Sequence, residues 1–453
     1  MNAKEYVENV IERVKTKNPA EPKFHQAVTE VLESLVPVIE KNPKYMKYKI
    51  LERITEPERV VMFRVTWEDD NGEIHVNKGF RVEFNSALGP YKGGLRFHPT
   101  VDLGTLKFLG FEQIFKNALT GLPMGGGKGG SDFDPHGKSD AEVRRFCENF
   151  MMELYRHIGQ FTDVPAGDIG VGAREIGYLY GTYRKITNLH GTCVLTGKSV
   201  NWGGSYIRPE ATGYGATYFL LEMLKSKGEE LKGKNVAISG SGNVAQYASQ
   251  KVTELGGKVV TLSDSKGAVI LDGLTKEMWD ALYEIKAIKR GRIKEWAEKF
   301  GLEYYEGKKV WEIADKVGEV HVAFPCATEN EINGEDAKRL VNAGLIAVVE
   351  GANMPSTPDA IDVYFENGVL YGPAKAANAG GVAVSGLEMS QNSIRLQWSR
   401  EEVDRRLHEI MVNIYKTCAK YAEKYGHPGN LMMGANIGGF VKVADAMVDQ
   451  GIY

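Results

Sequence analysis

Residues 235–262 limit the folds open to this chain more than any other stretch. Residues 235–240 have the pattern of a buried parallel strand, residues 240–245 read Gly-Ser-Gly-Asn-Val-Ala, and a helix follows to about Leu255. Two glycines end that helix, and residues 258–262 again have the pattern of a strand. This succession predicts a βαβ unit with a parallel sheet, and therefore an α/β domain.

The turn inside this unit has the spacing Gly-x-Gly-x-x-Ala, which in a strand–turn–helix context is typical of dinucleotide binding. Gly240 permits the tight turn, Gly242 lets a pyrophosphate approach the backbone, and Ala245 lets the helix pack closely on the strand. The start of the helix offers N–H donors and a positive dipole end to phosphates. An ordinary βαβ crossover without a ligand is the structural alternative.

Two later strands are predicted over residues 320–324 and 347–350. The first is followed by Pro-Cys-Ala-Thr and the second by Gly-Ala-Asn. Because ligands of open α/β sheets lie at the carboxyl ends of the strands, we expect Thr328 and Asn353 to contact a cofactor.

The first half of the chain carries lysines in glycine-rich segments. Residues 122–135 read Leu-Pro-Met-Gly-Gly-Gly-Lys-Gly-Gly-Ser-Asp-Phe-Asp-Pro, with Lys128 among five glycines, and residues 89–97 place Lys92 in a similar loop. Glycine lets the backbone approach a ligand closely, so we expect loops shaped around something small. A mobile glycine loop with an exposed lysine is the alternative.

Three further residues extend this set. Gln113 and Lys116 share one face of a helix predicted over residues 105–118, which meets either a carboxylate or water. Asp168 lies in a Pro/Gly-rich turn before a helix, either as a cap or as a functional carboxylate. Crowded lysines would lower one another's pKa, which would make Lys128 an acid or base near neutrality and Asp168 a proton acceptor for an amine.

The composition of the whole chain bounds the function. With 453 residues we expect two or three domains, and a net charge of −3 gives no reason to expect nucleic acid. No apolar run reaches the length of a membrane span, and the first ten residues lack a signal-peptide core. The four cysteines and nine histidines lack metal-ligand spacing, so we expect no metal site and a cytoplasmic protein.

An irregular polar stretch, residues 196–215, separates the two halves. We predict an N-terminal α/β substrate-binding domain over residues 1–200 and a Rossmann-like NAD(P)-binding domain over residues 201–425. A second glycine-rich loop is predicted over residues 378–386. A cleft between two such domains suits redox chemistry on a small anion.

Nearly the whole chain resembles the glutamate dehydrogenases, specifically the bacterial-type enzymes of about this length. The resemblance is carried by residues 91–97 (Tyr-Lys-Gly-Gly-Leu-Arg-Phe), 122–130, 165–168, 208–215 and 350–353. It implies reversible oxidative deamination of L-glutamate to 2-oxoglutarate and ammonium, with hydride transfer to NADP and closure of the domains over the substrate. It also implies a role in ammonium assimilation and a homohexamer built mainly through the first domain, on which the helix within residues 426–453 packs.

The resemblance assigns roles to residues. Lys128 would activate water against the iminium intermediate, and Asp168 would shuttle protons to and from the amine. The substrate-binding residues implied are Lys92, Gln113, Lys116, Gly167, Arg208, Val382 and Ser385. Lys116 with Gln113 would hold the α-carboxylate, Lys92 with Ser385 the side-chain carboxylate, and the backbone of Gly167 the amino group.

A second set of residues is implied for the nicotinamide cofactor. It comprises Thr212, Gly240, Ser241, Gly242, Asn243, Val244, Asp264, Ser265, Lys266, Lys286, Arg292, Ala327, Thr328, Gly351, Asn353 and Asn378. Asn378 would lie near the carboxamide of the nicotinamide.

Lys92 bears on substrate choice. Related leucine, valine and phenylalanine dehydrogenases place an apolar residue at its position. A buried ammonium needs a partner, and the second carboxylate of glutamate supplies one. We therefore predict glutamate as substrate. A dehydrogenase of aliphatic amino acids and a non-catalytic protein on the same fold are the alternatives.

Residues 263–266, Ser-Asp-Ser-Lys, bear on cofactor choice. Asp264 alone favours NAD, because an acidic residue there binds ribose hydroxyls and repels a 2′-phosphate. Its neighbours are donors, and Lys286, Lys289, Arg290 and Arg292 form a basic run that either reaches a phosphate or is a solvated helix face. The resemblance also extends to NADP-linked members, so we predict NADP, with NAD as the alternative.

Overall fold

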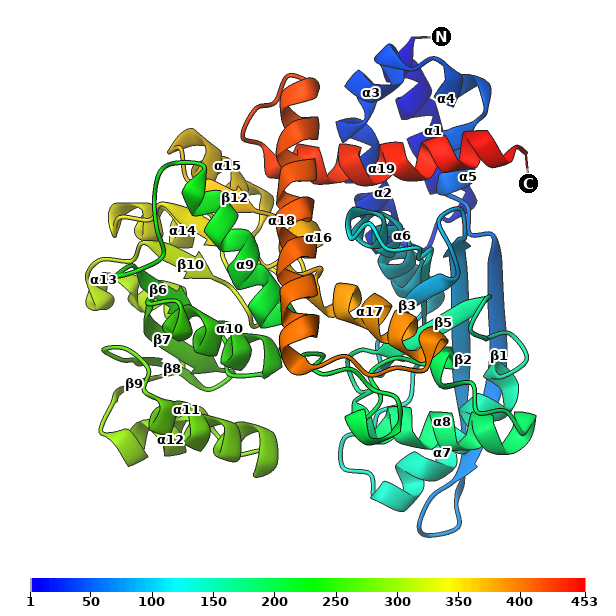
Figure 1. The fold of residues 1–453 in the computed structure, drawn as a ribbon, viewed down its shortest axis with the longest axis horizontal. Coiled ribbons are helices and arrows are strands. Elements are labelled where there is room, and N and C mark those ends of the chain that lie inside the picture. The colour runs from blue at the N-terminus through cyan, green and yellow to red at the C-terminus, as the bar shows by residue number, and fades with distance from the viewer. Residues whose placement is uncertain (1, 453) are drawn as a thin grey trace. The chain divides into compact units, whose positions relative to one another are not determined.

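Residues 2–452 are described by the computed structural model, and they form two compact units (Figure 1). The first comprises residues up to Arg208, Val382–Val403 and residues from Asn436 on, and the second comprises Pro209–Gly381 and Asp404–Ala435. This division differs from the one drawn from the sequence, because residues 201–208 and 382–403 belong to the first unit. Side chains of residues 385–397 hydrogen-bond to residues 197–208 and hold the two segments together.

The first unit contains a mixed sheet of five strands in the order β1-β2-β4-β3-β5. The strands are β1 (Arg59–Glu68), β2 (Ile74–Asn85), β3 (Tyr91–Phe97), β4 (Gly126–Ser131) and β5 (Asp163–Gly167). Strands β1 and β2 form a hairpin and pair antiparallel. Strand β3 runs parallel to both β4 and β5.

The predicted glycine loops around Lys92 and Lys128 are wrong, because these residues lie on two adjacent buried strands, β3 and β4, and β5 pairs with β3 on its other side. The glycines allow backbones to approach where a side chain would collide. A Cβ on Gly93 would lie 1.7 Å from the carbonyl oxygen of Gly127, and one on Gly126 would lie 2.7 Å from Ile114 of the overlying helix. The glycines thus bring three functional segments together within one sheet.

Helices flank this sheet. They are α1 (Ala3–Lys17), α2 (Pro22–Ser34), α3 (Val36–Lys41), α4 (Lys44–Lys47), α5 (Ile50–Ile54), α6 (Leu103–Leu119), α7 (Asp140–Leu154), α8 (Ala173–Thr187) and most of α17 (Gly380–Ile394). An aromatic cluster between the sheet and α7 forms part of the core, where Phe133 stacks on Phe146 with ring centroids 3.8 Å apart. The predicted helix over residues 105–118 is confirmed as α6.

Helix α19 (Leu431–Gln450) is long and apolar enough to cross a membrane by length and composition alone, which the sequence reading did not anticipate. In the structure, 61% of the most apolar 18-residue part of this helix is buried. The ring of Phe440 packs edge-on against Tyr45, and the Tyr45 hydroxyl donates to Asp445 at 2.8 Å. These are the contacts of a core helix packed on the first unit.

The second unit contains a sheet of seven strands in the order β12-β11-β10-β6-β7-β8-β9. They are β6 (Asn235–Ile238), β7 (Lys258–Asp264), β8 (Gly267–Ile270), β9 (Glu303–Glu306), β10 (Val322–Phe324), β11 (Ala347–Val349) and β12 (Leu370–Gly372). Strands β12 to β7 pair in parallel, and β8 and β9 pair antiparallel. The predicted parallel βαβ unit is confirmed, with α10 (Asn243–Glu254) as its helix.

The remaining helices belong mainly to the second unit. They are α9 (Ala211–Lys225), α11 (Lys276–Tyr283), α12 (Ile293–Phe300), α13 (Ala314–Val317), α14 (Gly334–Asn342), α15 (Pro358–Glu366), α16 (Ala374–Ala377) and α18 (Arg400–Lys424). The glycine-rich loop predicted over residues 378–386 is wrong, because α17 begins at Gly380. A Cβ on Gly380 would lie 2.1 Å from the carbonyl oxygen of Ala211, so this glycine marks a close approach to α9.

Candidate active site

Lys128 and Asp168 meet in the first unit. Lys128 lies in β4, Asp168 directly follows β5, and the Lys128 Nζ is 3.4 Å from the Asp168 Oδ2. Arg96 of β3, to which the sequence reading gave no role, donates from Nε to the same oxygen at 2.7 Å. The carboxylate after β5 is therefore held between two cations from the adjacent strands β4 and β3.

Burial and charge shift both groups. Burial lowers the pKa of Lys128 below its usual value, and repulsion from Arg96 lowers it further, although Asp168 opposes the shift. Burial would raise the pKa of Asp168, but the charges of Lys128 and Arg96 outweigh burial and the pKa is lowered. The predicted direction for Lys128 is confirmed, but its chief causes are burial and arginines rather than other lysines. At neutral pH Asp168 is an anion that can accept a proton, and Lys128 loses its proton more readily than an exposed lysine.

Lys92 lies on β3 and is fully buried. Its Nζ donates to the carbonyl oxygen of Val164 at 3.0 Å and to the Thr196 Oγ1 at 2.6 Å. None of the ion pairs found among residues 2–452 involves this ammonium. Since a lysine ammonium has three donors, one N–H is left for an oxygen of a ligand. Burial is the largest cause of a pKa well below the usual value for Lys92.

Arg208, Val382 and Ser385 also lie in the first unit. The Arg208 Nε donates to the Ser385 Oγ at 3.0 Å, and Val382 lies one turn before Ser385 on α17. Burial lowers the pKa of Arg208 below its usual value. Gly167 ends β5 immediately before Asp168. The structure thus brings the predicted residues Arg208 and Ser385 into direct contact.

Gln113 and Lys116 lie on α6, as predicted. The Gln113 Nε2 donates to the Asn117 Oδ1 at 2.7 Å, and the Asn117 Nδ2 donates to the carbonyl oxygen of Lys92 at 3.0 Å. Gln113 is therefore linked to the strand of Lys92 through one amide. Lys116 follows one turn later and is half-buried.

The second unit presents the predicted nucleotide turn between β6 and α10. Gly240 has φ +81°, and its N–H donates to the Ser263 Oγ at 2.8 Å, which ties the turn to β7. Gly242 is exposed, and a Cβ added there would meet nothing within 4 Å, so the backbone is open to a ligand. No side chain caps the start of α10 at Gly242. The first N–H groups of α10 are therefore suited to a pyrophosphate.

The other predicted cofactor residues surround the same edge of the sheet. Asn378 donates from Nδ2 to the Asn353 Oδ1 at 2.9 Å, and the buried Oδ1 of Asn378 has no hydrogen-bond partner in the described chain. The backbone amides of Ala327 and Thr328 donate to Glu331 at 3.0 and 3.3 Å. A Cβ on Gly351 would lie 3.0 Å from Val244. An orphaned buried carbonyl beside an open glycine turn fits a bound dinucleotide with a carboxamide.

Thr212 and Ser241 complete this set from two sides. Thr212 lies at the start of α9, which approaches α10 so closely that a Cβ on Gly213 would lie 2.4 Å from the backbone nitrogen of Ala248. Ser241 is buried in the turn. Asn243 donates from Nδ2 to the carbonyl oxygen of Pro209 at 2.6 Å, which fixes its side chain at the start of α10.

Asp264 is already occupied by donors from its own unit. Its carboxylate accepts from the Lys266 N–H at 2.9 Å, from the Ile293 N–H at 3.0 Å and from the Lys286 Nζ at 3.3 Å. Burial would raise the pKa of Asp264, but these donors lower it below its usual value, so it stays charged. The Arg292 Nη1 donates to the Ser265 Oγ at 3.2 Å. Three of about four acceptor positions of the carboxylate are taken, and two cations lie beside it.

Some residues of these sites had no signal in the sequence. Thr196, Lys198 and Glu388 join the surroundings of Lys92. Thr196 and Lys198 lie in the stretch described from the sequence only as irregular and polar, and Glu388 lies just beyond the loop predicted over residues 378–386. Asp69, Glu73 and His75 also come together at the β1–β2 turn with a spacing that could hold a metal ion. Asp69 already accepts from Asn71, Glu73 and His75, which closes the turn.

The two units define a class of protein. A dinucleotide turn on a largely parallel sheet, and a separate α/β unit in which a buried lysine meets a partly buried aspartate near a second buried lysine, are features of amino acid dehydrogenases. Residues 203–451 match the model of the Glutamate/Leucine/Phenylalanine/Valine dehydrogenase family, and residues 57–185 match the dimerisation domain of the Glu/Leu/Phe/Val dehydrogenases. The chain belongs to this family.

Relatives extend over the whole chain. It is 61% identical to the NADP-specific glutamate dehydrogenase of Giardia intestinalis and 58% identical to that of Haemophilus influenzae, covering 98% and 97% of both chains in the two comparisons. It is also 53% identical to the NAD-specific glutamate dehydrogenase of Bacteroides fragilis, over 98% of this chain and 99% of the relative.

Two solved structures bear on the fold and on assembly. The Plasmodium falciparum glutamate dehydrogenase superposes with a TM-score of 0.96 at 54% identity, over 100% of this chain and 96% of that one. The hetero-hexameric glutamate dehydrogenase of Thermus thermophilus superposes with a TM-score of 0.79 at 28% identity, over 92% and 96% of the two chains.

Proposed function

We propose that the protein is a glutamate dehydrogenase that converts L-glutamate, NADP⁺ and water reversibly into 2-oxoglutarate, ammonium, NADPH and a proton. The observation that carries this proposal is the buried ammonium of Lys92, which has one N–H free and no carboxylate at ion-pair distance in the described chain. A substrate with a second carboxylate completes its hydrogen bonds and balances its charge. The substrates of the leucine, phenylalanine and valine dehydrogenases in this family lack that carboxylate.

Lys128 and Asp168 are assigned the acid–base steps. Asp168 is charged at neutral pH and accepts a proton from the substrate amine, and Lys128 activates the water that attacks the iminium carbon. Arg96 keeps Asp168 in place through its hydrogen bond. The turn at Gly240–Gly242 and the start of α10 would hold NADP, which would supply the hydride acceptor for the α-carbon.

The remaining residues of the first unit are assigned to substrate binding. Lys116 with Gln113 holds the α-carboxylate, and Lys92 with Ser385 holds the side-chain carboxylate. The backbone of Gly167 meets the amino group, and Arg208 orients Ser385 through their hydrogen bond. Val382 lies beside them on α17 and lines the path of the aliphatic chain.

NADP is the proposed cofactor because Asp264 is engaged by its own unit while Lys286 and Arg292 lie beside it. The two NADP-specific relatives agree with this choice, and the NAD-specific relative makes the test necessary. Initial rates with 2-oxoglutarate and ammonium, measured by nicotinamide absorbance with NADPH and NADH side by side, test both proposals. A preference for NADH would assign the ribose to Asp264, and no rate with either would remove glutamate as substrate.

A homohexamer is the proposed assembly. Strand β1 is an edge of its sheet, and the hairpin exposes apolar side chains at alternate positions, with Met62 66%, Ile74 68% and Val76 63% exposed. An exposed apolar edge strand favours pairing with another chain. The dimerisation-domain match covers this hairpin, and the Thermus enzyme is hexameric. Sedimentation equilibrium of the protein tests the assembly, and Met62→Lys is expected to reduce it.

A cytoplasmic location and a role in ammonium assimilation are part of the same proposal. The four cysteines are free and buried in the structure. Cell fractionation with an activity assay tests the location, and growth on ammonium as sole nitrogen source, with and without the active protein, tests the role.

A further inference from the structure

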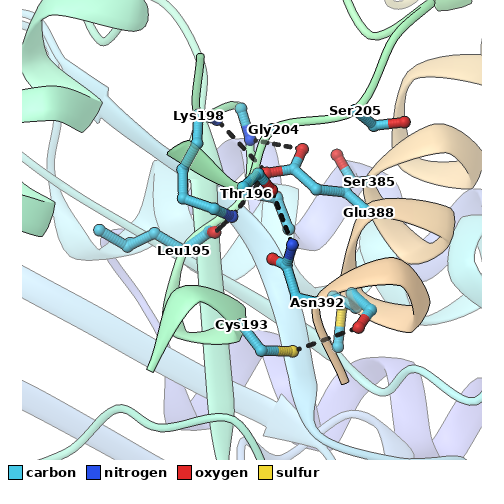
Figure 2. A network of polar contacts seen from close by, with 12 residues as sticks. Cys193, Leu195, Thr196, Lys198, Gly204, Ser205, Ser385, Glu388 and Asn392 are labelled. Carbon is cyan, nitrogen blue, oxygen red and sulfur yellow. Dashed lines mark hydrogen bonds and ion pairs between the residues drawn. The ribbon is translucent and has the colours of Figure 1, made fainter. Parts of the chain in front are cut away.

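Lys198 and Glu388 form an ion pair that is completely buried in the first unit (Figure 2). The Lys198 Nζ lies 2.6 Å from the Glu388 Oε1, and neither side chain has exposed surface. The two residues are far apart in the sequence, in the segment after β5 and in α17. A buried ion pair is not in itself stabilising compared with apolar residues, so its presence calls for another reason.

Glu388 also holds the backbone of the segment that carries Lys198. It accepts from the Gly197 N–H at 3.0 Å and from the Lys198 N–H at 3.4 Å. Lys198 in turn donates from Nζ to the carbonyl oxygen of Leu195. Residues 195–198 are thus fixed around one carboxylate and one ammonium, with Thr196 inside this short segment.

Thr196 connects this segment to Lys92. Its Oγ1 accepts from the Lys92 Nζ at 2.6 Å, and its N–H donates to the carbonyl oxygen of Pro165 in β5 at 3.0 Å. Because the Thr196 hydroxyl accepts one N–H of Lys92, its position sets the direction in which the free N–H of Lys92 points. The position of this hydroxyl depends in turn on the hydrogen bonds that Glu388 accepts from the backbone N–H groups of residues 197 and 198.

The same helix also carries Ser385, one turn before Glu388 (Figure 2). Ser385 accepts from Arg208 at 3.0 Å. Helix α17 therefore positions two of the side chains around Lys92. It carries Ser385 itself, and it holds Thr196 in place through Glu388. Around this site three cations, Lys92, Lys198 and Arg208, face Glu388 as their only carboxylate within the interactions found among residues 2–452.

We propose that the Lys198–Glu388 pair positions the pocket for the second carboxylate of the substrate, and thereby sets the preference for 2-oxo dicarboxylates over 2-oxo monocarboxylates of the same length. Both residues are positioning residues, because neither is needed to touch the substrate. This inference rests on the proposed function, since it concerns the same pocket.

The test compares 2-oxoglutarate with 2-oxopentanoate, which has the same carbon chain without the second carboxylate. Glu388→Gln keeps an acceptor oxygen but leaves Lys198 without its counter-charge. We expect kcat/KM for 2-oxoglutarate to fall by about tenfold or more, mainly through KM, the effect of one misplaced charged hydrogen bond. The kcat/KM for 2-oxopentanoate and the KM for ammonium should change by less than about threefold, within the spread of small effects.

Three further variants keep the test decisive. Glu388→Asp retains the charge but shortens the side chain, and should lower the preference for 2-oxoglutarate even if Glu388→Gln does not fold. Thr196→Val replaces only the hydroxyl, by a methyl group of similar size, and should reproduce the loss of preference with Glu388 intact. Lys107→Met breaks another well-buried pair of the first unit, Lys107–Glu21 at 2.7 Å, and should lower the melting temperature without changing the preference.

The outcomes separate the two proposals. If the unmodified protein turns over glutamate but the Glu388 variants lose both 2-oxo acids equally, or neither, the positioning role is wrong and the proposed function stands. If the unmodified protein shows no turnover of glutamate with either cofactor, the proposed function itself fails, and the positioning role fails with it.

Discussion

The site of the first unit and the site of the second unit treat charge in opposite ways. The first unit buries Lys92 and Lys128 on its sheet strands and partly buries Asp168 directly after β5, and burial together with neighbouring charges shifts their pKa values. The second unit offers backbone N–H groups at the start of α10 and keeps Lys286 and Arg292 at the edge of its sheet. The site in the first unit has an excess of positive charge that a substrate carboxylate would balance. In the second unit, Asp264 and Lys286 already balance each other without a ligand.

This difference has a physical reason. A buried ammonium that is not fully balanced by a counter-charge is destabilising. Lys92 shares the carboxylate of Glu388 with Lys198 and Arg208, so a matching substrate carboxylate stabilises the first unit, and this makes binding selective. Backbone donors at a helix start are polar but uncharged, so the second unit tolerates solvent in their place. Substitutions should therefore be severe and selective in the first unit and graded in the second.

The largest expected effect is that of Lys128→Ala. Removing this group takes away the acid–base partner of Asp168, so we expect kcat to fall by about a thousandfold, within the range for general acid–base residues. Stopped-flow and steady-state nicotinamide absorbance measure the change. Lys78→Ala, at an exposed position on β2, is the matched control and should retain full activity. A Lys128→Ala protein with normal turnover would contradict the catalytic assignment.

The next effect is that of Lys92→Leu, which replaces the buried ammonium by an apolar group. We expect kcat/KM for glutamate to fall by about a hundredfold or more, because a charged hydrogen bond and its partner are lost. The rate with norvaline, which lacks the second carboxylate, should rise relative to glutamate. A variant whose relative rates for glutamate and norvaline were unchanged would assign the carboxylate to another residue.

The pH dependence of KM gives an independent check on Lys92. Burial holds its pKa well below 10.5, so raising the pH removes its charge in a range where an exposed lysine would stay charged. The KM for 2-oxoglutarate should therefore rise with pH below 10.5, while the KM for 2-oxopentanoate should not follow it. Parallel pH profiles for both substrates would show that another group titrates.

A smaller effect, on stability, is expected in the second unit. Burial raises the pKa of Glu350 from 4.5 to about 7, while its Oε2 accepts from the Ala374 N–H at 2.8 Å. A carboxyl with a raised pKa binds its proton more tightly in the folded state, so its contribution to the free energy of unfolding falls by about 3 kcal/mol as the pH rises from 4.5 through 7.

Glu350→Gln should abolish this dependence. The difference in stability between the variant and the unmodified protein should shift in favour of the variant as the pH rises from 5 to 8. Urea unfolding at both pH values measures this difference, and a difference that is independent of pH would show that Glu350 is ionised in the folded protein.

The two units also differ in how far the sequence predicted them. The βαβ unit is local, since strand, turn, helix and next strand follow within residues 235–264, and each was predicted in its place. The glycine segments around Lys92 and Lys128 were read as loops, because glycine is rare inside strands. Their strand structure depends on contacts such as Gly93 against Gly127 and Gly126 against α6, which the sequence does not show.

For the site in the first unit, the sequence indicated the main functional residues but not the hydrogen bonds that connect them to other side chains. Lys92, Lys128 and Asp168 stood out because each lies in a motif of glycines and prolines. Arg96 lies inside one of these motifs, but only the strand order β4-β3-β5 brings it to Asp168. Thr196 and Glu388 lie in no motif, and their link to Lys92 depends on the packing of α17 on a loop nearly 200 positions earlier in the chain.

The smallest expected effect concerns the 2′-phosphate of the cofactor in the second unit. Lys286 and Arg292 are engaged by Asp264 and Ser265, whereas Lys289 of the same basic run pairs with Glu284 at 2.7 Å. We expect Lys286→Ala and Arg292→Ala each to raise the KM for NADPH by about tenfold, the effect of one charge-assisted hydrogen bond. The KM for NADH should change little, because NADH lacks that phosphate.

Lys289→Ala is the matched control for this comparison, because it removes the same charge from the same run but from an exposed side chain that pairs with Glu284 and not with Asp264. It should leave the KM values for NADPH and NADH unchanged. If Lys289→Ala weakens NADPH as much as Lys286→Ala does, the run acts through its summed charge rather than through a defined phosphate site. Increasing the salt concentration would then weaken NADPH binding by a similar factor in all three variants.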